Sequence, residues 1–202
     1  MRVGLRAAIF GVASLAIVGF VFLLAWALSN RTPVTGLSGI TRLQKPAPEF
    51  TMPLLDGGEV TVSRSREAPI VVNFWASWCA PCRDEANGLE RAWRSFKDRG
   101  VLFVGVDVQD TEQDAKIYVN EFEVTYPNGR DVDGKITVDY GVIGLPVTFF
   151  INSDGIVERR WVGAVSEARL MAWVDEMVSG AVPSGEVEGS NPEGFFKLDQ
   201  DK

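Results

Sequence analysis

The most constraining feature of this sequence is its single pair of cysteines, Cys79 and Cys82, which stand between a strand pattern and a helix pattern. Residues 70–75 (IVVNFW) form a short apolar, β-branched run that is typical of a buried strand. After the cysteines, apolar residues recur at spacings of three and four, at Ala86, Leu89, Ala92, Trp93 and Phe96. This spacing predicts a helix that ends at Gly100. A Cys-x-x-Cys motif in this context predicts a dithiol at a helix N-terminus within an α/β domain.

The position of the two cysteines indicates thiol–disulfide exchange. A sulfur at a helix N-terminus faces unpaired N–H groups and the positive end of the helix dipole, which favour the thiolate. The thiolate is the attacking species, so Cys79 is the expected nucleophile, and Cys82, one turn further along, resolves the mixed disulfide. Pro81 suits the first helical turn because its missing N–H would have no partner there.

Composition argues against other uses of the cysteine pair. The 202 residues include no His, so neither a Cys–His catalytic pair nor a four-ligand Cys/His zinc site can form. We therefore expect no metal and no cofactor. A structural disulfide across so short a loop would restrain the unfolded chain very little. The net charge of −7 argues against nucleic acid as a partner, because nucleic acid binds basic surfaces.

Residues 7–28 form an uncharged apolar segment that predicts a transmembrane helix. At 1.5 Å per residue the segment would be about 33 Å long, enough to cross a hydrocarbon core of about 30 Å. The apolar core of a signal peptide is usually shorter, at about 7–15 residues. Residues 25–27 (AWA) do have the small-x-small spacing of a cleavage site, so removal of the segment remains the alternative.

Charges on either side of this segment predict its orientation. Arg2 and Arg6 precede it, so the positive-inside rule places residues 1–6 in the cytoplasm. Arg31 and Arg42 on the far side weaken this prediction without reversing it. The expected location is the cell membrane, with one span and the catalytic domain on the extracytoplasmic side.

The rest of the chain divides by composition into three parts. Residues 29–44 are small and polar without a helical period, which is typical of a linker. Residues 45–180 have the length and apolar content of one compact domain. Residues 181–202 are rich in Gly, Ser, Pro and acidic residues, which predicts a disordered tail.

Apolar runs and helical patterns alternate within the compact domain. A second buried strand is expected at 101–106 and a helix from Thr111 to Phe122. Residues 147–151 and 156–162 flank an Asn-Ser-Asp-Gly turn and should pair as a hairpin. Ser166 can cap a last helix. This order predicts an α/β fold with a central mixed sheet flanked by helices, and the Asp56-Gly57-Gly58 turn adds a small N-terminal hairpin.

Residues 71–82 (VVNFWASWCAPC) resemble the thioredoxin-like family, and specifically its membrane-tethered TlpA/ResA/CcmG branch. Residues 47–50 with the following turn resemble the opening hairpin of that branch, and residues 140–151 resemble the segment that carries its cis-proline. The long stretch from 107 to 140 fits the mid-domain insertion of the branch. The resemblance implies a thioredoxin fold with an N-terminal hairpin and this insertion.

The resemblance also implies roles for residues around the dithiol. Glu85 matches an active-site glutamate and would exchange a proton with Cys82, although the helix dipole alone also favours an acid there. Pro146, after Leu145, would have a cis peptide bond, lie beside the dithiol and bind the substrate backbone. Trp78 would shape the substrate surface. Asn73 stands where thioredoxin keeps a buried acid, so proton transfer would fall to Glu85 or to water.

The activity implied by the resemblance is that of an extracytoplasmic thiol:disulfide oxidoreductase. It would reduce disulfides in client proteins, with apocytochrome c the leading candidate, and a membrane electron donor would reduce it again. Two alternatives remain at this point. The protein could introduce disulfides as a general oxidant, because reduction potentials of related folds range from about −270 to −120 mV. It could also be a non-catalytic module that binds apocytochrome or a metallochaperone.

Overall fold

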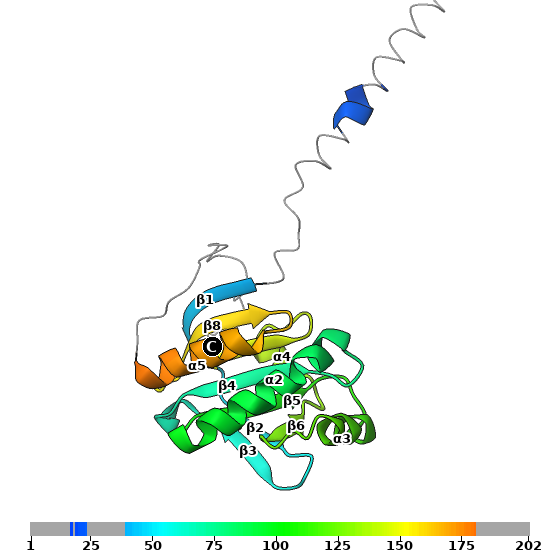
Figure 1. Ribbon diagram of the computed structural model, residues 1–202. Coiled ribbons are helices and arrows are strands. Elements are labelled where there is room, and N and C mark those ends of the chain that lie inside the picture. Colours follow the sequence, from blue (N-terminus) through cyan, green and yellow to red (C-terminus); the bar gives the residue numbers. More distant parts are fainter. Residues whose placement is uncertain (1–16, 18, 24–38, 181–202) are drawn as a thin grey trace, which may run out of the picture. The chain divides into compact units, whose positions relative to one another are not determined.

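The computed structural model describes residues 17, 19–23 and 39–180 (Figure 1). The expected cytoplasmic residues 1–6, most of the apolar segment 7–28 and the expected tail 181–202 lie outside the described residues. Among the residues that are described, no helix is both long and apolar enough to cross a membrane. The chain divides into two units, Met1–Gly36 and Leu37–Lys202, and the second contains the folded domain of residues 39–180.

A mixed sheet of six strands forms the centre of this domain, in the order β1-β8-β7-β4-β5-β6. Strands β4, β5 and β6 are parallel to one another, whereas β7, β8 and β1 continue the sheet in antiparallel pairs. The strands are β1 (Gly39–Pro46), β4 (Ile70–Trp75), β5 (Leu102–Asp107), β6 (Asn128–Arg130), β7 (Val147–Ile151) and β8 (Ile156–Val162). A separate hairpin consists of β2 (Phe50–Pro53) and β3 (Glu59–Val62).

Four α-helices accompany the sheet, and two of them, α2 and α5, lie side by side on one face (Figure 1). The helices are α2 (Ala80–Phe96), α3 (Glu112–Glu121), α4 (Lys135–Asp139) and α5 (Glu167–Ser179). Two short 3-10 turns are η1 (Arg64–Arg66) and η2 (Lys97–Arg99). The segment between β5 and β7 therefore contributes α3, β6 and α4, and this is where the sequence predicts an insertion.

Most elements agree with the sequence-based predictions. The two buried strands, the opening hairpin and the hairpin at 147–162 are confirmed. Helix α2 is followed by η2, and Gly100 then adopts the left-handed backbone with φ 84° that ends the helical region. The Thr111 side chain caps α3 by accepting the N–H of Asp114. Ser166 precedes α5 as expected, but its side chain makes no capping hydrogen bond.

The boundary of the expected linker 29–44 is wrong. Strand β1 begins at Gly39 and pairs antiparallel with β8, so residues 39–44 belong to the folded sheet. The sequence does not reveal this strand because it is an edge strand with a polar composition and a register shift between Arg42 and Lys45. Its pairing depends on the backbone of β8, about 115 residues away in the chain.

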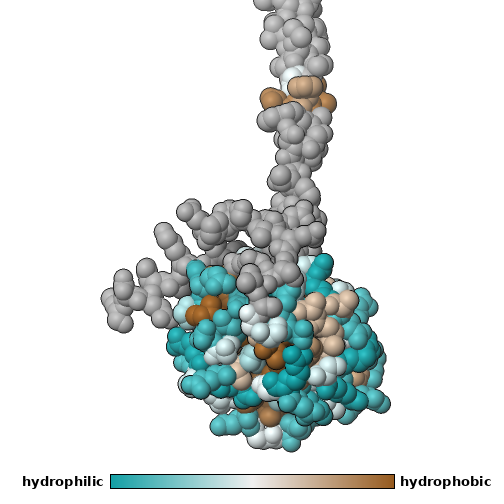
Figure 2. All heavy atoms as spheres, turned by 60° about the vertical axis from the view of Figure 1, so that its left-hand side comes forward, coloured by the Kyte–Doolittle hydropathy of each residue, from teal (hydrophilic) through white to brown (hydrophobic). Residues whose placement is uncertain are grey.

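Apolar side chains pack on both faces of the sheet, as alternation along each strand requires. Val72 and Phe74 of β4 face a core that includes Tyr140 beyond α4 and residues of the β2–β3 hairpin. Val71 faces the opposite core, which α2 and α5 cover. The face shown in Figure 2 is mostly hydrophilic, with apolar residues in small separate areas.

The parallel pairing of β4 and β5 determines where the dithiol lies. Trp75 at the end of β4 pairs with Asp107 at the end of β5, and all six residues of each strand are buried. The carboxyl ends of parallel strands meet at one edge of a sheet, and this is the usual position of functional sites in open α/β sheets. The Cys-x-x-Cys loop and the loop after β5 therefore emerge together.

Candidate active site

Cys79 and Cys82 form a disulfide at the N-terminus of α2, with their Cα atoms 5.3 Å apart. Cys79 is the N-cap residue of the helix, and its Sγ accepts the backbone N–H of Cys82 at 3.3 Å. Pro81 lies in the first turn, as the sequence predicts. A reduced Cys79 would therefore carry its charge where a helix N-terminus stabilises an anion.

Cys79 is less accessible than the sequence suggests. An exposed nucleophile is expected from the motif, yet only 5% of Cys79 and none of Cys82 is exposed in the disulfide. The pair lies in a cluster with Trp75, Ala76 and Ala86, and Leu145 packs against this cluster. Cys79 is the more accessible of the two cysteine residues, which agrees with the order of attack expected for it.

Trp78 is the large apolar side chain beside the dithiol that faces solvent, with 60% of its surface exposed. Its indole Nε1 donates to the carbonyl of Gln109 at 3.2 Å. The preceding residue, Ser77, donates its N–H to Oδ2 of Asp110 at 2.6 Å. Hydrogen bonds from the loop after β5 thus hold the loop that carries Cys79 in place and leave much of the Trp78 side chain exposed to solvent.

Glu85 is buried one turn after Cys82 on the same helix, with 3% of its surface exposed. Its Oε1 accepts Nδ2 of Asn73 at 2.8 Å, and its Oε2 accepts the backbone N–H of Val165 at 2.8 Å. Asn73 also donates to Thr148 of the neighbouring strand at 3.1 Å. The structure thus brings together Asn73 and Glu85, two residues that the sequence singles out separately.

Burial raises the pKa of Glu85 to about 8, and the hydrogen bonds from Val165 and Asn73 offset only part of this effect. A carboxyl in this environment changes protonation state near neutral pH, which is a requirement for a general acid or base at that pH. An acid placed only to favour the helix dipole would be expected on the helix surface. The burial of Glu85 therefore speaks against a role limited to the dipole.

The Leu145–Pro146 peptide bond is cis, as the resemblance implies. Pro146 directly precedes β7, the strand that pairs antiparallel with β4. Its carbonyl accepts the N–H of Gly163 at 2.9 Å. Because Leu145 packs against the cluster that contains the disulfide, the segment 145–146 lies on the dithiol side of the domain.

Two acidic residues, Asp107 at the end of β5 and Asp110 in the loop after it, carry no signal of a site in the sequence pattern. Asp107 is buried, and neither of its carboxylate oxygens has a hydrogen-bond partner among the described residues. Burial and the nearby Asp110 raise the pKa of Asp107 to about 8, while Arg130 acts in the opposite direction. An open cavity of about 430 Å³ adjoins these residues and reaches α4. The one clue in the sequence is that Asp107 ends a strand that is parallel to β4, which places it at the same edge of the sheet.

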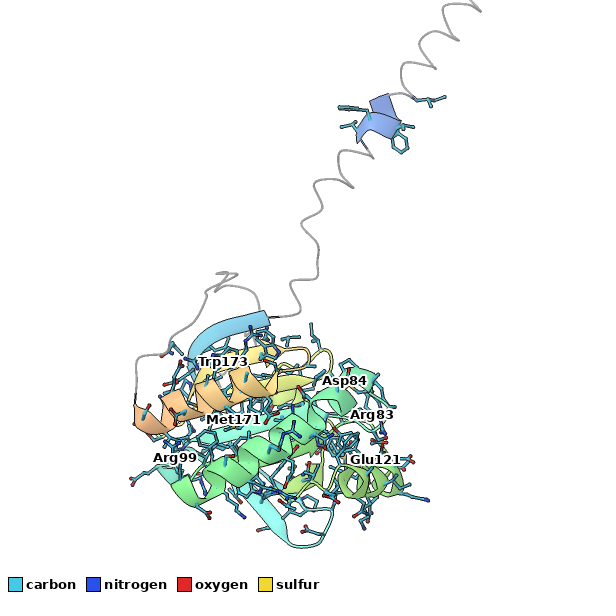
Figure 3. All side chains as sticks on the ribbon, viewed as in Figure 1. Arg83, Asp84, Arg99, Glu121, Met171 and Trp173 are labelled. Atoms are coloured by element: carbon cyan, nitrogen blue, oxygen red, sulfur yellow. A yellow bond between two sulfur atoms is a disulfide. The ribbon has the colours of Figure 1, made fainter. Side chains whose placement is uncertain are left out.

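Tyr118 is a further residue that the sequence does not reveal, because its place in the stripe of α3 predicts only a core residue. Its Oη donates to the backbone carbonyl of Cys82 at 2.9 Å, and its ring stacks on Trp75. Arg83 and Glu121 form an ion pair between α2 and α3 beside this contact, as the two labelled side chains in Figure 3 show. Helix α3 therefore contacts the dithiol turn directly.

Comparison with known proteins agrees with this geometry. The model of the AhpC/TSA family matches residues 43–160, more than half of the chain. The chain belongs to this family. It is 34% identical over 137 residues to the thiol:disulfide interchange protein DsbE of Pseudomonas fluorescens biotype C, covering 67% of this chain and 73% of that protein. With its Cys79–Cys82 pair, the protein is a thiol–disulfide oxidoreductase of the ResA/DsbE type.

Two further relatives support the same conclusion. The thiol-disulfide oxidoreductase ResA of Bacillus thuringiensis subsp. konkukian is 29% identical over 133 residues, covering 66% of this chain and 77% of that protein. A secreted Mycobacterium tuberculosis disulfide oxidoreductase, described as homologous to E. coli DsbE, superposes with a TM-score of 0.58 at 27% identity. That comparison covers 66% of this chain and 96% of the other. The similarity thus lies in the dithiol domain.

Replacing Glu85 with Gln should remove a pH-dependent loss of stability. Glu85 has a pKa of about 8 when folded, against 4.5 for an unperturbed Glu, so between these values the folded state keeps a proton that the unfolded state has lost. Stability of the wild type should therefore fall as pH rises through this window, by up to about 1.4 kcal/mol per pH unit. Urea unfolding of the oxidised proteins at pH 5 and pH 8 measures this difference.

In this comparison the wild type should lose stability relative to Glu85→Gln between pH 5 and pH 8. Both proteins are tested as disulfides, so that the cysteines do not titrate. Rotation of the Asn73 amide lets its oxygen accept from the new glutamine amide, which keeps the variant hydrogen bonded. Equal pH slopes in the two proteins would show that Glu85 is already ionised in the folded state at pH 5.

Proposed function

We propose that this oxidoreductase reduces disulfides of client proteins outside the cytoplasm while tethered to the cell membrane by residues 7–28. Apocytochrome c is the proposed client, and a membrane electron carrier is the proposed donor. The observation that carries the reductive chemistry is the Cys79–Cys82 pair at the N-terminus of α2, with the buried carboxyl of Glu85 one turn below. The resemblance of residues 71–82 to the TlpA/ResA/CcmG branch supports the choice of client.

The reaction uses two electrons from the reduced dithiol. The Cys79 thiolate attacks one sulfur of the client disulfide, which forms a mixed disulfide and releases the first client sulfur as a thiolate. Cys82 then loses its proton and attacks Sγ of Cys79, which releases the second client thiolate. The client disulfide has been reduced, and the enzyme is left with the Cys79–Cys82 disulfide.

The ionised form of Glu85 is the proposed acceptor of the Cys82 proton, and with a pKa of about 8 the fraction of this form grows as the pH rises through neutrality. Glu85 lies three residues after Cys82 on α2, a spacing that places two side chains on the same helix face. Its pKa of about 8 is close to that of an ordinary thiol, so proton transfer between the two groups costs little free energy. Asn73 donates to the carboxyl and keeps it oriented, but as an amide it cannot carry the proton itself.

The surface beside the dithiol supports binding of a client chain. Pro146 is buried, but Trp78 presents an exposed indole next to Cys79, and the half-buried Leu145 packs against the cluster that contains the disulfide. Their apolar surface offers contacts that do not depend on a particular client sequence. The chain as a whole has a net charge of −7, which disfavours indiscriminate binding to acidic proteins.

The reduction potential of the Cys79–Cys82 couple distinguishes a reductant from an oxidant. We expect a value nearer to that of thioredoxin, about −270 mV, than to that of DsbA, about −120 mV. Equilibration with glutathione or dithiothreitol buffers, followed by alkylation of free thiols, measures it. A value near −120 mV would identify the protein as a disulfide-forming oxidant and would leave its fold and family unaffected.

A client should accumulate on Cys79 when Cys82 is replaced by Ser. In Cys82→Ser the mixed disulfide cannot be resolved, because the second attacking sulfur is missing. We expect a covalent complex with apocytochrome c in cells, visible on non-reducing gels and identified by mass spectrometry. Cys79→Ser is the matched control and should trap nothing. If Cys82→Ser traps only other proteins, apocytochrome c is not the client.

Reporter fusions test the proposed membrane topology. A reporter that is active only in the cytoplasm should be inactive when fused after Lys202 and active when fused before Met1. The reason is that Arg2 and Arg6 hold the N-terminus inside. The full-length protein should sediment with membranes, whereas cleavage after residues 25–27 would release it. Activity of the C-terminal fusion would contradict the extracytoplasmic location.

A further inference from the structure

The phenol of Tyr118 contacts the dithiol turn from a different helix. Its Oη donates to the backbone carbonyl of Cys82 at 2.9 Å, and both residues are buried although they are 36 positions apart in the chain. The ring stacks on Trp75, with centroids 4.1 Å apart and planes inclined by 20°. Packing thus fixes the position of this hydroxyl. It takes no part in the thiol–disulfide exchange steps described above.

The peptide group that Tyr118 contacts belongs to a chain of hydrogen bonds through both cysteines. The N–H of the same Cys82–Arg83 peptide donates to the backbone carbonyl of Cys79 at 3.2 Å. The N–H of Cys82, which belongs to the preceding peptide, is shared between the backbone carbonyl of Cys79 at 3.1 Å and Sγ of Cys79 at 3.3 Å. Hydrogen bonds in such a chain polarise one another. The Tyr118 hydroxyl, by donating to the Cys82 carbonyl, therefore strengthens the turn at residues 79–83. This turn directs the Cys82 N–H at Sγ of Cys79.

Helix α3 is held against α2 at this point by charged and aromatic contacts. Arg83 pairs with Glu121 (Figure 3), and its guanidinium lies 5.0 Å from the centroid of the Phe122 ring. Burial raises the pKa of Tyr118 above its usual range, with a smaller contribution from Glu85. The phenol therefore stays protonated at physiological pH and remains a hydrogen-bond donor to Cys82.

We propose that Tyr118 is a positioning residue for the dithiol: by holding the Cys82 backbone in place, it stabilises the Cys79 thiolate and thereby the reduced enzyme. In the disulfide, Sγ of Cys79 is neutral and accepts the Cys82 N–H weakly. In the reduced enzyme the thiolate accepts the same N–H through a charge-assisted bond, which is roughly twice as strong. The hydroxyl of Tyr118 thus contributes more to the reduced state than to the oxidised state.

Tyr118→Phe removes this hydroxyl and keeps the ring that packs on Trp75. The equilibrium with glutathione should shift about threefold to tenfold toward the disulfide, and a tenfold shift corresponds to about 30 mV of more negative potential. The midpoint of the alkylation rate of Cys79 against pH should move to higher pH, since the thiolate has lost stabilisation. Both measurements use the purified full-length protein in detergent.

Tyr140→Phe is the matched control. The Tyr140 hydroxyl also donates to a backbone carbonyl, that of Pro48, at 2.9 Å, and its ring is equally buried. Tyr140 belongs to the core on the other face of the sheet, away from the cluster that contains the disulfide. Its replacement should lower the free energy of unfolding without changing the glutathione equilibrium or the alkylation midpoint.

Urea unfolding of both redox forms separates positioning from a purely structural role. If the proposal is correct, Tyr118→Phe destabilises the reduced protein more than the oxidised protein, by the amount that the shift in the glutathione equilibrium requires. A structural hydrogen bond would contribute equally to both forms. Equal destabilisation, or a shift in the equilibrium no larger than that of Tyr140→Phe, would overturn the proposal.

Discussion

The chemistry of this protein depends on a sulfur that occupies the N-cap position of a helix. Cys79 is both the end of the loop after β4 and the residue that caps α2, so its Sγ accepts an N–H that a helix start leaves unpaired. This position requires β4 to be rigid and buried on both faces, because a shift of the strand would move the sulfur relative to the helix. The sheet, with β5 and β7 on either side of β4, meets that requirement.

Burial raises the pKa of both carboxyl groups near the dithiol, but the two groups differ in their hydrogen bonds. Glu85 and Asp107 both have a pKa raised to about 8, chiefly because burial penalises the charged form. Glu85 receives two hydrogen bonds that hold it in one orientation, whereas the oxygens of Asp107 receive none from the described residues. An oriented carboxyl on the helix of the dithiol is suited to defined proton exchange, and this distinguishes Glu85 from Asp107.

The segment between β5 and β7 contributes contacts that hold the dithiol turn in place. Its helix α3 brings Tyr118 to the Cys82 carbonyl and Glu121 to Arg83, and its loop brings Asp110 to the N–H of Ser77. The dithiol loop is thus held by α3 and the loop before it, and Leu145 at the end of the same segment packs against the cluster that contains the disulfide. A cysteine pair at the start of a helix would be possible without these contacts, but its geometry would be less constrained.

The sequence by itself determined the order of the elements from β4 to α3 and from β7 to α5, the dithiol and its place at a helix N-terminus. These features depend on local patterns: the apolar run of residues 70–75, the spacing of apolar residues after Cys82 and the turn at 152–155. Tertiary structure decided the rest. Strand β1 forms only because β8 offers it an edge, Glu85 reaches a pKa of about 8 only because other elements bury it, and Tyr118 meets Cys82 across 36 residues. Pairing, desolvation and contacts between distant residues arise from the packed fold, and a local pattern does not encode them.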